Sequence, residues 1–285
     1  MVRTIAVFNL KGGVGKTTLA VNLGAALQLM GKRVLLVDLD PQHDLTMYLG
    51  VNPAQLKGVE YFITRDLKFA EIVRSYNHRF DFLPSGKKLR DLEDLMSALY
   101  VNYKKMNFLI RDAFLHIEQQ YDYIIFDCPP AGGQLTINAL SYVQDVFLPV
   151  QCQFLALRGS KKALFLIYRV KTLFNPALRL GAVIPVMYDP RNRLSSVIVE
   201  KLHNAYGDYL TDTKIRINVS LAEAPGFGKT IFDYKPFSRG AQDFKKLARE
   251  VAEMPAGELR LEQSLSHLVD SSVQHVMAGL RANNA

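Results

Sequence analysis

The segment "NLKGGVGKTT", Asn9 to Thr18, decides the fold, and it carries two lysines five residues apart, Lys11 and Lys16. Its second half, Gly15 to Thr17, fits the end of the phosphate-binding pattern Gly-x-x-x-x-Gly-Lys-Ser/Thr. The first glycine of that pattern would fall at position 10, where the chain has Leu10. The extra lysine, Lys11, follows directly, so this loop departs from the common pattern at its start.

The sequence on both sides of the loop predicts a strand, a helix and a second strand. Residues 4–8 are apolar and β-prone, residues 17–30 repeat apolar side chains at helical spacing, and residues 33–37 are again β-prone. Gly31 is placed to end the helix. This order of elements predicts a βαβ unit with parallel strands.

The rest of the chain continues the alternation of strands and helices. Strands are predicted at 80–83, 123–126, 145–149 and 182–187, and helices over 90–117 and 161–174. We therefore predict an α/β fold, a single doubly wound domain over residues 1–254 with a mostly parallel twisted sheet flanked by helices, as in P-loop NTPases. Apolar residues then recur at three- and four-residue spacing, which predicts an appended C-terminal amphipathic helix within residues 255–285.

The composition is that of an ordinary globular protein with a basic excess. Apolar residues make up 49% and charged residues 22% of the 285 residues, and the net charge of +8 weakly favours an acidic partner such as nucleic acid or an anionic membrane surface. The cysteines, Cys128 and Cys152, are too few for a disulfide scaffold and stand outside any metal-binding spacing. A cytoplasmic protein is expected.

The glycine-rich loop predicts a nucleotide site. Glycines let backbone N–H groups turn toward phosphate oxygens, and the following helix adds its positive end. Lys16 would reach the β- and γ-phosphates, the Thr17 hydroxyl would ligate Mg²⁺, and Thr18 is placed at the α-phosphate. The predicted contacts in the loop are Gly12, Gly13, Val14, Gly15, Lys16, Thr17 and Thr18.

Aspartates at the ends of two other strands complete this prediction. In "YDYIIFDCPP" four apolar residues lead to Asp127, which would hold Mg²⁺ through water, although a strand-end aspartate can also cap a helix. In "VDLDPQ", Asp40 lies further along the loop and is the better candidate to position the attacking water. Asp38 would orient the Mg²⁺ waters or the loop, or serve only as a turn residue before Pro41.

Together these motifs resemble the ParA/MinD family of P-loop ATPases, whose deviant loop reads K-G-G-x-G-K-T-T, and in particular its ParA branch with the Soj-like partition ATPases. Segments similar to that branch follow in the usual order. They are "LPSG" at 83–86, "LTINAL" at 135–140, "PVQCQFLAL" at 149–157 and "LAEAPGFGKTIFDYKP" at 221–236. The resemblance covers roughly residues 2–252.

The resemblance implies a use for the extra lysine. In this family the first lysine of the motif crosses a dimer interface to the partner's ATP, so Lys11 would neutralise the charge of two facing nucleotides. The alternative is a solvated loop lysine. The family also implies that adenine lies near "IRINVSL", 215–221, where this chain keeps Asn218 but lacks the arginines that are usual there. Asn218 is therefore the candidate base contact.

The resemblance further implies an ATP-dependent homodimer that binds DNA nonspecifically on the nucleoid, with hydrolysis stimulated by a ParB-like or adaptor protein. No Asp or Glu occurs from Val146 to Tyr188, whereas Lys and Arg are frequent there and again further on. The candidate DNA-binding residues are Arg158, Lys161, Lys162, Arg169, Lys201, Lys214, Arg216, Lys245 and Lys246.

Two other functional classes share the loop. MinD-like membrane association would require a basic C-terminal helix, but the predicted tail helix carries Glu262 and Asp270 on its polar face and suits anionic lipid poorly. Metal-cluster carriers and nitrogenase-like reductases require interface cysteines, whereas Cys128 and Cys152 lie beside predicted buried strands. A membrane-associated positioning ATPase therefore stays as the alternative, and the cargo is open.

Overall fold

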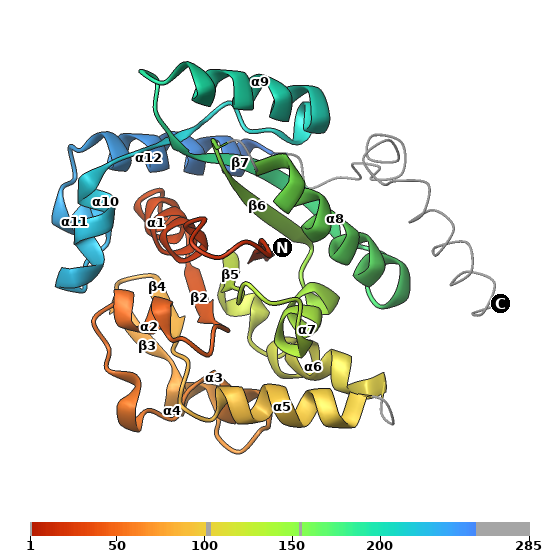
Figure 1. The fold of residues 1–285 in the computed structure, drawn as a ribbon. Helices are drawn as coiled ribbons and strands as arrows, with labels where there is room; N and C mark the ends of the chain where they lie inside the picture. Colours follow the sequence, from red (N-terminus) through yellow and green to blue (C-terminus); the bar gives the residue numbers. More distant parts are fainter. Residues whose placement is uncertain (1, 101–103, 154–155, 255–285) are drawn as a thin grey trace.

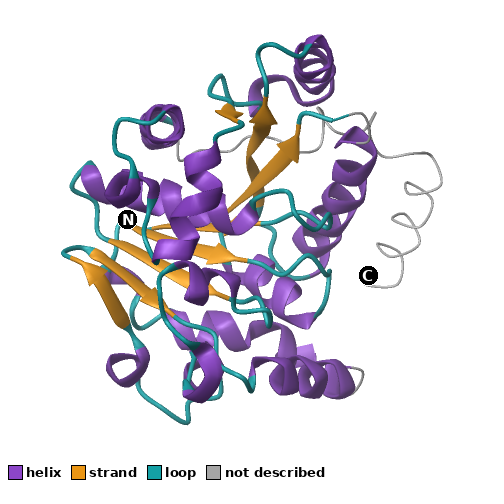
Figure 2. Ribbon diagram, turned by 60° about the vertical axis from the view of Figure 1, so that its left-hand side comes forward, coloured by secondary structure: helices purple, strands orange, loops and turns teal. Residues whose placement is uncertain are grey.

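A twisted eight-stranded sheet lies between two layers of helices in the computed structural model, which describes residues 2–100, 104–153 and 156–254 (Figure 1). Figure 2 shows the strands at the centre with helices on both sides. The predicted amphipathic tail helix at 255–285 lies outside the described residues. The predicted α/β class and mostly parallel sheet are confirmed.

The strand order in the sheet is β3-β4-β2-β5-β1-β6-β7-β8. Among the strands of the described residues, only β3 runs antiparallel to its neighbour, β4. The strands are β1 Arg3–Val7, β2 Val34–Asp38, β3 Arg74–Asn77, β4 Phe80–Leu83, β5 Tyr123–Asp127, β6 Asp145–Gln151, β7 Arg179–Tyr188 and β8 Ile215–Arg216. Because β2 and β6 lie on opposite sides of β1, the chain changes direction in the sheet there, where open α/β sheets bind ligands.

Twelve α-helices and five short 3₁₀ helices are found in the described part of the chain. The α-helices are α1 Lys16–Leu29, α2 Asp44–Tyr48, α3 Val59–Ile63, α4 Phe69–Ile72, α5 Leu89–Tyr100, α6 Leu109–Phe114, α7 Gln134–Tyr142, α8 Ala156–Leu173, α9 Arg193–Tyr206, α10 Val219–Glu223, α11 Ile231–Tyr234 and α12 Arg239–Glu253. The 3₁₀ helices are η1 Pro53–Gln55, η2 Lys104–Phe108, η3 Glu118–Gln120, η4 Gly207–Tyr209 and η5 Ala224–Phe227.

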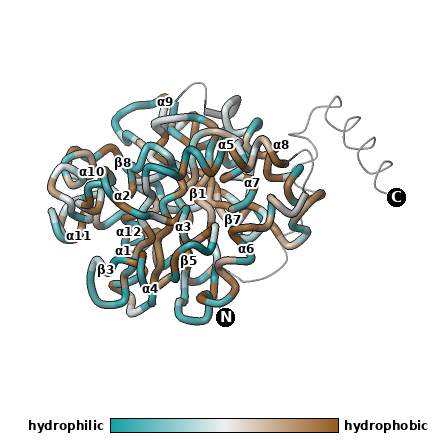
Figure 3. The backbone as a smooth tube through the Cα atoms, turned by 90° about the horizontal axis from the view of Figure 1, so that it is seen from below, coloured by the Kyte–Doolittle hydropathy of each residue, from teal (hydrophilic) through white to brown (hydrophobic). Residues whose placement is uncertain are grey.

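Two hydrophobic cores lie on opposite faces of the sheet. Alternate side chains of a strand point to opposite faces, so Ala6 belongs to the core that includes residues of α3 to α9, whereas Ile5 and Val7 belong to the core that includes residues of α1, α2 and α10 to α12. Figure 3 shows the hydrophobic segments gathered in the interior of the described chain. The central strands are buried on both faces, which explains their continuous apolar runs.

The structure differs from the sequence prediction at two places. The short strands β3 and β8 have too few apolar residues to be recognised. The segment 90–117, predicted to be largely helical, is confirmed as such, and its described part contains α5, η2 and α6, which each pack against α7. The helix predicted to begin at 161 begins earlier, as α8 at Ala156.

Candidate active site

The loop between β1 and α1 forms an open cradle. Gly13 and Gly15 have φ angles of +68° and +80°, which side chains other than glycine rarely adopt. A Cβ added at Gly12, Gly13 or Gly15 would meet no atom within 4 Å, so the space over the loop is open to a ligand. Val14 is buried and anchors the loop from below. The loop therefore leaves open space over its glycines, as the predicted phosphate contact requires.

The N-terminus of α1 faces this cradle. The helix begins at Lys16 without a side-chain cap and without an acidic residue in its first turn, so its N–H groups are available to an anion. Lys16 is 7% exposed and lies close enough to Asp127 to lower the pKa of that carboxyl. A buried ammonium beside an open glycine-rich loop can bind phosphate groups.

Three aspartates gather at the same edge of the sheet. Asp38 of β2 and Asp127 of β5 are register partners on neighbouring strands, and both are buried. Burial, followed by the nearby Asp38 carboxylate, raises the pKa of Asp127 well above its usual range. Asp40, two residues beyond Asp38, is 7% exposed and raises the Asp127 pKa further. This concentration of acids favours a cation between them.

The residues present fit Mg²⁺ bound together with a nucleotide. Among the described residues, neither carboxylate oxygen of the buried Asp127 has a hydrogen-bond partner of good geometry. The Thr17 hydroxyl approaches Asp127 and lowers its pKa, so a hydroxyl and an unpartnered carboxylate meet beside the cradle. Oxygen donors of this kind are the ligands that Mg²⁺ takes in nucleotide sites. Thr17 would be the direct ligand and Asp127 would act through water.

Asp38 holds the loop rather than a ligand. Its Oδ2 accepts hydrogen bonds from the Thr46 hydroxyl at 2.6 Å, the Thr46 N–H at 2.9 Å and the Ser85 hydroxyl at 2.8 Å. Its Oδ1 accepts from the Asp40 N–H at 3.1 Å. Burial raises the pKa of Asp38 to about 6, although these hydrogen bonds oppose the rise. The sequence reasoning assigned no site role to Thr46 or to Ser85, although Ser85 belongs to the segment "LPSG" that resembles the ParA branch.

The loop that carries Asp40 is fixed by its own turn. The Asp40 carboxylate accepts a hydrogen bond from the Gln42 N–H at 2.9 Å, and the Asp40 carbonyl accepts one from the His43 N–H at 2.9 Å. His43 has a φ of 62°, and its ring lies 2.8 Å from the Ser85 hydroxyl. Asp40 is therefore held at the edge of the cradle, which suits the predicted role of positioning water.

Lys11 folds back onto its own chain. Its Nζ donates to Gln151 Oε1 at 2.7 Å, and its backbone N–H donates to Asn9 Oδ1 at 3.1 Å. Gln151, at the end of β6, also donates from Nε2 to the carbonyl of Gly13 at 2.8 Å. Gln151 and Asn9 thus tie the deviant start of the loop to β6. The sequence reasoning had not assigned either residue to the site.

The predicted base contact lies at the far end of the same edge, after β8. Asn218 precedes α10, but its side chain makes no capping hydrogen bond. Its Oδ1 is buried and has no partner within the described part of the chain. The neighbouring Arg216 is held by Asp243, an ion pair at 2.6 Å. That pair neutralises the Arg216 guanidinium, which weakens the case for the predicted DNA contact at this residue.

The structure separates the other predicted DNA-binding residues into two groups. Lys161, Lys162 and Arg169 on α8 and Lys201 on α9 are exposed on one layer of helices. Lys245 and Lys246 on α12 are exposed on the opposite layer. Lys214 donates to the carbonyl of Asp212 at 3.2 Å, and the Arg158 side chain lies outside the described residues. The exposed lysines and arginine therefore lie on both layers of helices.

Comparison with known sequences places the chain among partition proteins. The sequence model of a family described as "AAA domain" matches residues 2–180. Over 255 residues the chain is 39% identical to the sporulation initiation inhibitor protein Soj of Bacillus subtilis, covering 88% of this chain and 99% of that protein. It is 37% identical to the chromosome partitioning protein ParA of Caulobacter vibrioides, covering 87% and 93%.

Solved structures share the fold of this chain. Cobyrinic acid a,c-diamide synthase from Mycobacterium smegmatis, solved with ADP and magnesium, is 31% identical, has a TM-score of 0.76 and covers 88% of this chain and 94% of its own. McdA from Cyanothece, solved as an ATP complex, shares the fold with a TM-score of 0.77 at 19% identity, covering 90% and 99%. Among the described helices, none is long and apolar enough to cross a membrane.

Proposed function

Since the chain belongs to the ParA/Soj family of P-loop ATPases and is an ATPase that uses Mg²⁺, we propose that ATP joins two copies of it and that hydrolysis separates them. The dimer binds DNA nonspecifically on the nucleoid, and a ParB-like or adaptor protein stimulates hydrolysis. Repeated cycles position a plasmid, a chromosome or another cargo. Relatives named chromosome partitioning proteins support this assignment.

Residues at the carboxyl edge of the sheet have different roles in binding and hydrolysing ATP. The glycine-rich loop and Lys16 bind the phosphates, and Asn218 meets the base. Mg²⁺, held by Thr17 and by Asp127 through water, neutralises part of the phosphate charge when it is bound. Asp40 orients the attacking water, because its carboxylate is held at the rim of the cradle by Gln42.

Lys11 has a role in the other copy's site. It leaves Gln151 and reaches the phosphates of the ATP bound by the facing copy. Two facing triphosphates repel one another strongly, and one lysine from each side offsets that repulsion. ATP therefore stabilises the dimer, and loss of the γ-phosphate removes the contact that joins the copies.

The observation that carries this proposal is the apolar surface around the site. Most of the large exposed apolar side chains of the described chain lie at the carboxyl edge of the sheet or in the segments next to it. They are Met47, Met187, Leu194, Val197, Ile217, Val219, Phe227 and Phe237. Exposed apolar side chains on the edge that carries the nucleotide site favour burial against a second copy, since large exposed apolar groups often mark interfaces.

DNA binding follows from the same arrangement. In a dimer joined at this edge, the basic residues of α8 and α9 come from both copies and the surface doubles in charge. Phosphate contacts supply most of nonspecific affinity and make it steeply dependent on salt. We therefore expect the dimer, and not the monomer, to bind random duplex DNA.

Fluorescence anisotropy with a random duplex tests this part of the proposal. Affinity should rise at least about tenfold when MgATP is added and fall steeply between 50 and 200 mM salt, as counterion release requires. The double variants Lys161→Glu/Lys162→Glu, on α8, and Lys245→Glu/Lys246→Glu, on α12, carry the same change of charge on the two helical layers. The layer whose variant loses affinity for DNA is the layer that binds it. An affinity for DNA that does not depend on ATP or on salt would contradict DNA as the partner. ATP-dependent binding to anionic vesicles in place of DNA would contradict it as well.

A further inference from the structure

The turn after β8, residues 217–218, lies between β8 and α10 and is held by few backbone contacts. The strand β8 has two residues at the edge of the sheet, and its pairing with β7 shifts register there. Beyond it, the Ile217 N–H donates to the Tyr188 carbonyl at 3.0 Å, while the Ile217 and Val219 side chains are 62% and 71% exposed. A turn with so little packing requires side-chain support to keep one conformation.

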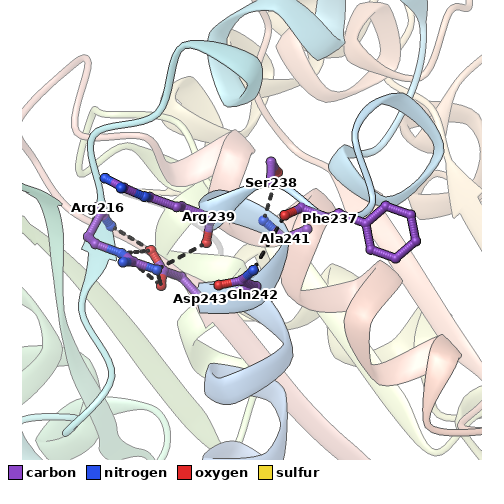
Figure 4. A network of polar contacts seen from close by, with 7 residues as sticks. All are labelled: Arg216, Phe237, Ser238, Arg239, Ala241, Gln242 and Asp243. Carbon is purple, nitrogen blue, oxygen red and sulfur yellow. Dashed lines mark hydrogen bonds and ion pairs between the residues drawn. The ribbon is translucent and has the colours of Figure 1, made fainter.

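That support comes from Arg216 and Asp243 (Figure 4). The Arg216 Nε donates to both carboxylate oxygens of Asp243, at 3.1 and 2.9 Å, and Nη2 donates to Oδ1 at 2.6 Å. The backbone N–H of Arg216 donates to Oδ2 at 3.1 Å. The Asp243 side chain is 5% exposed and that of Arg216 is 29% exposed, so this is a forked, charge-assisted pair whose carboxylate is buried.

The pair fastens the turn to the frame that carries the phosphate loop. Asp243 lies on α12, whose first turn is capped by the Ser238 hydroxyl, which accepts from the Ala241 N–H at 3.2 Å. The buried face of α12, including Phe244 and Leu247, shares a core with α1, and the two helices pack together. The helix α1 begins at Lys16, at the phosphate end of the site, and α12 holds Asp243, beside the turn that carries Asn218. The packing of α1 against α12 therefore connects the phosphate end with the base end.

Asn218, the second residue of the turn, has a side-chain oxygen that accepts no hydrogen bond from the described part of the chain. Among the described residues, the buried Asn218 Oδ1 has no partner, and the side chain is not used to cap α10. A carboxamide oxygen accepts a hydrogen bond and so requires a donor. The exocyclic amino group of adenine is a donor, whereas the base of inosine triphosphate has a carbonyl oxygen at that position.

We propose that Arg216 and Asp243 are a positioning pair, which holds the turn so that the Asn218 carboxamide meets the amino group of adenine and favours ATP over inosine triphosphate. This rests on the proposed contact between Asn218 and the base. Neither residue of the pair touches the nucleotide. Their effect reaches it through the backbone of the turn, from Arg216 to Asn218.

Competition binding of ATP and inosine triphosphate to the Asp243→Asn variant tests the pair. The substitution keeps the shape of the side chain and removes the charge that fixes Arg216. We expect ATP affinity to fall about tenfold and inosine triphosphate affinity to change less than about twofold, so that the preference for ATP nearly disappears. A merely destabilised protein would lose affinity for both nucleotides alike. An unchanged preference, or an equal loss, overturns the proposal.

Two further variants make the outcome specific. Asp233→Asn removes an aspartate of α11 that accepts from Tyr76 and Thr230, in the same layer but away from the turn, and it should keep the preference for ATP. Asn218→Ala should abolish that preference. If Asn218→Ala abolishes it and Asp243→Asn does not, the pair has no positioning role. If Asn218→Ala also leaves it intact, the proposed base contact itself is wrong.

Discussion

The two ends of the nucleotide site are built differently. At the phosphate end, the glycine-rich loop, Asp38 and Asp127 follow the central strands β1, β2 and β5, which are buried on both faces. At the base end, Asn218 follows a two-residue edge strand and stands among exposed side chains. The first end is fixed by the fold itself, whereas the second depends on one pair of side chains.

This difference shows where binding of the phosphates and recognition of the base arise in the fold. Phosphate binding requires rigid backbone amides and charges, which central strands supply. Base recognition and contact with a second copy require side chains that are accessible, and an edge turn supplies those. Substitutions at the phosphate end should therefore change hydrolysis and stability. Substitutions at the base end should change nucleotide preference and dimer formation.

The largest effect is expected at the phosphate end, from Lys16→Ala. Removing the buried ammonium beside Asp127 takes away the cation that meets the β- and γ-phosphates. Phosphate release from ATP should fall by at least about 10²-fold, as for the loss of one strong electrostatic contact to the reacting group. Lys57→Ala is the control, because its ammonium lies over the Tyr61 ring, away from the cradle. Equal rates for the two variants would contradict the assignment of Lys16.

The second effect concerns the pH dependence of the nucleotide-free protein. Asp38 has a pKa of about 6 when folded, against 3.8 when exposed, so between these values the folded state binds a proton that the unfolded state releases. Its contribution to the free energy of unfolding is present below pH 3.8 and is lost as pH rises through about 6. The loss amounts to about 3 kcal/mol.

Urea unfolding at pH 5 and pH 7, without nucleotide, measures this contribution. The wild-type protein should lose more stability over this interval than the Asp38→Asn variant, which cannot titrate at this position. Identical losses in the two proteins would show that Asp38 does not carry the raised pKa.

The third effect is the loss of a buried hydroxyl, in Thr46→Val. The Thr46 Oγ1 donates to Asp38 and accepts from the Ser85 N–H at 2.9 Å, so valine leaves the buried Ser85 N–H without this acceptor and removes one of the three hydrogen bonds to Asp38 Oδ2. The free energy of unfolding should fall by about 1–3 kcal/mol. Ser97→Ala, which removes an exposed hydroxyl on α5, should stay within about 0.5 kcal/mol of the wild type in the same urea titration. Similar losses in both variants would contradict the role of Thr46.

The smallest effect on stability is expected at the base end, from Ile217→Ser. Its side chain is 62% exposed, so the free energy of unfolding should change by less than about 0.5 kcal/mol. The ATP-dependent dimer, by contrast, should weaken, because the proposed apolar contact between copies loses a member. Urea titration and sedimentation velocity with MgATP measure the two quantities. A decrease of more than about 1 kcal/mol in the free energy of unfolding would contradict the proposed difference between the phosphate end and the base end.

The same contrast decides what could be predicted from the sequence. The central strands and the loop from Gly12 to Thr18 were found because continuous apolar runs and glycine spacing are local signals. Thr46, Ser85 and Gln151 were missed because each acquires its role only when distant strand ends meet. The Arg216–Asp243 pair was missed for the same reason, whereas the strand β8 was missed because it is only two residues long, and Arg216 was instead assigned to DNA on its charge and the family resemblance.

Sedimentation velocity of the Asp40→Ala protein with MgATP, alone and combined with Lys11→Ala, tests the central claim most directly. Without Asp40 hydrolysis should stop, and the ATP-bound protein should sediment as a dimer. Adding Lys11→Ala should return it to a monomer that still binds ATP, because Lys16 and the loop are intact. A monomeric Asp40→Ala protein with ATP bound, or a dimer that survives the loss of Lys11, would contradict an ATP-joined dimer in which Lys11 reaches the other copy.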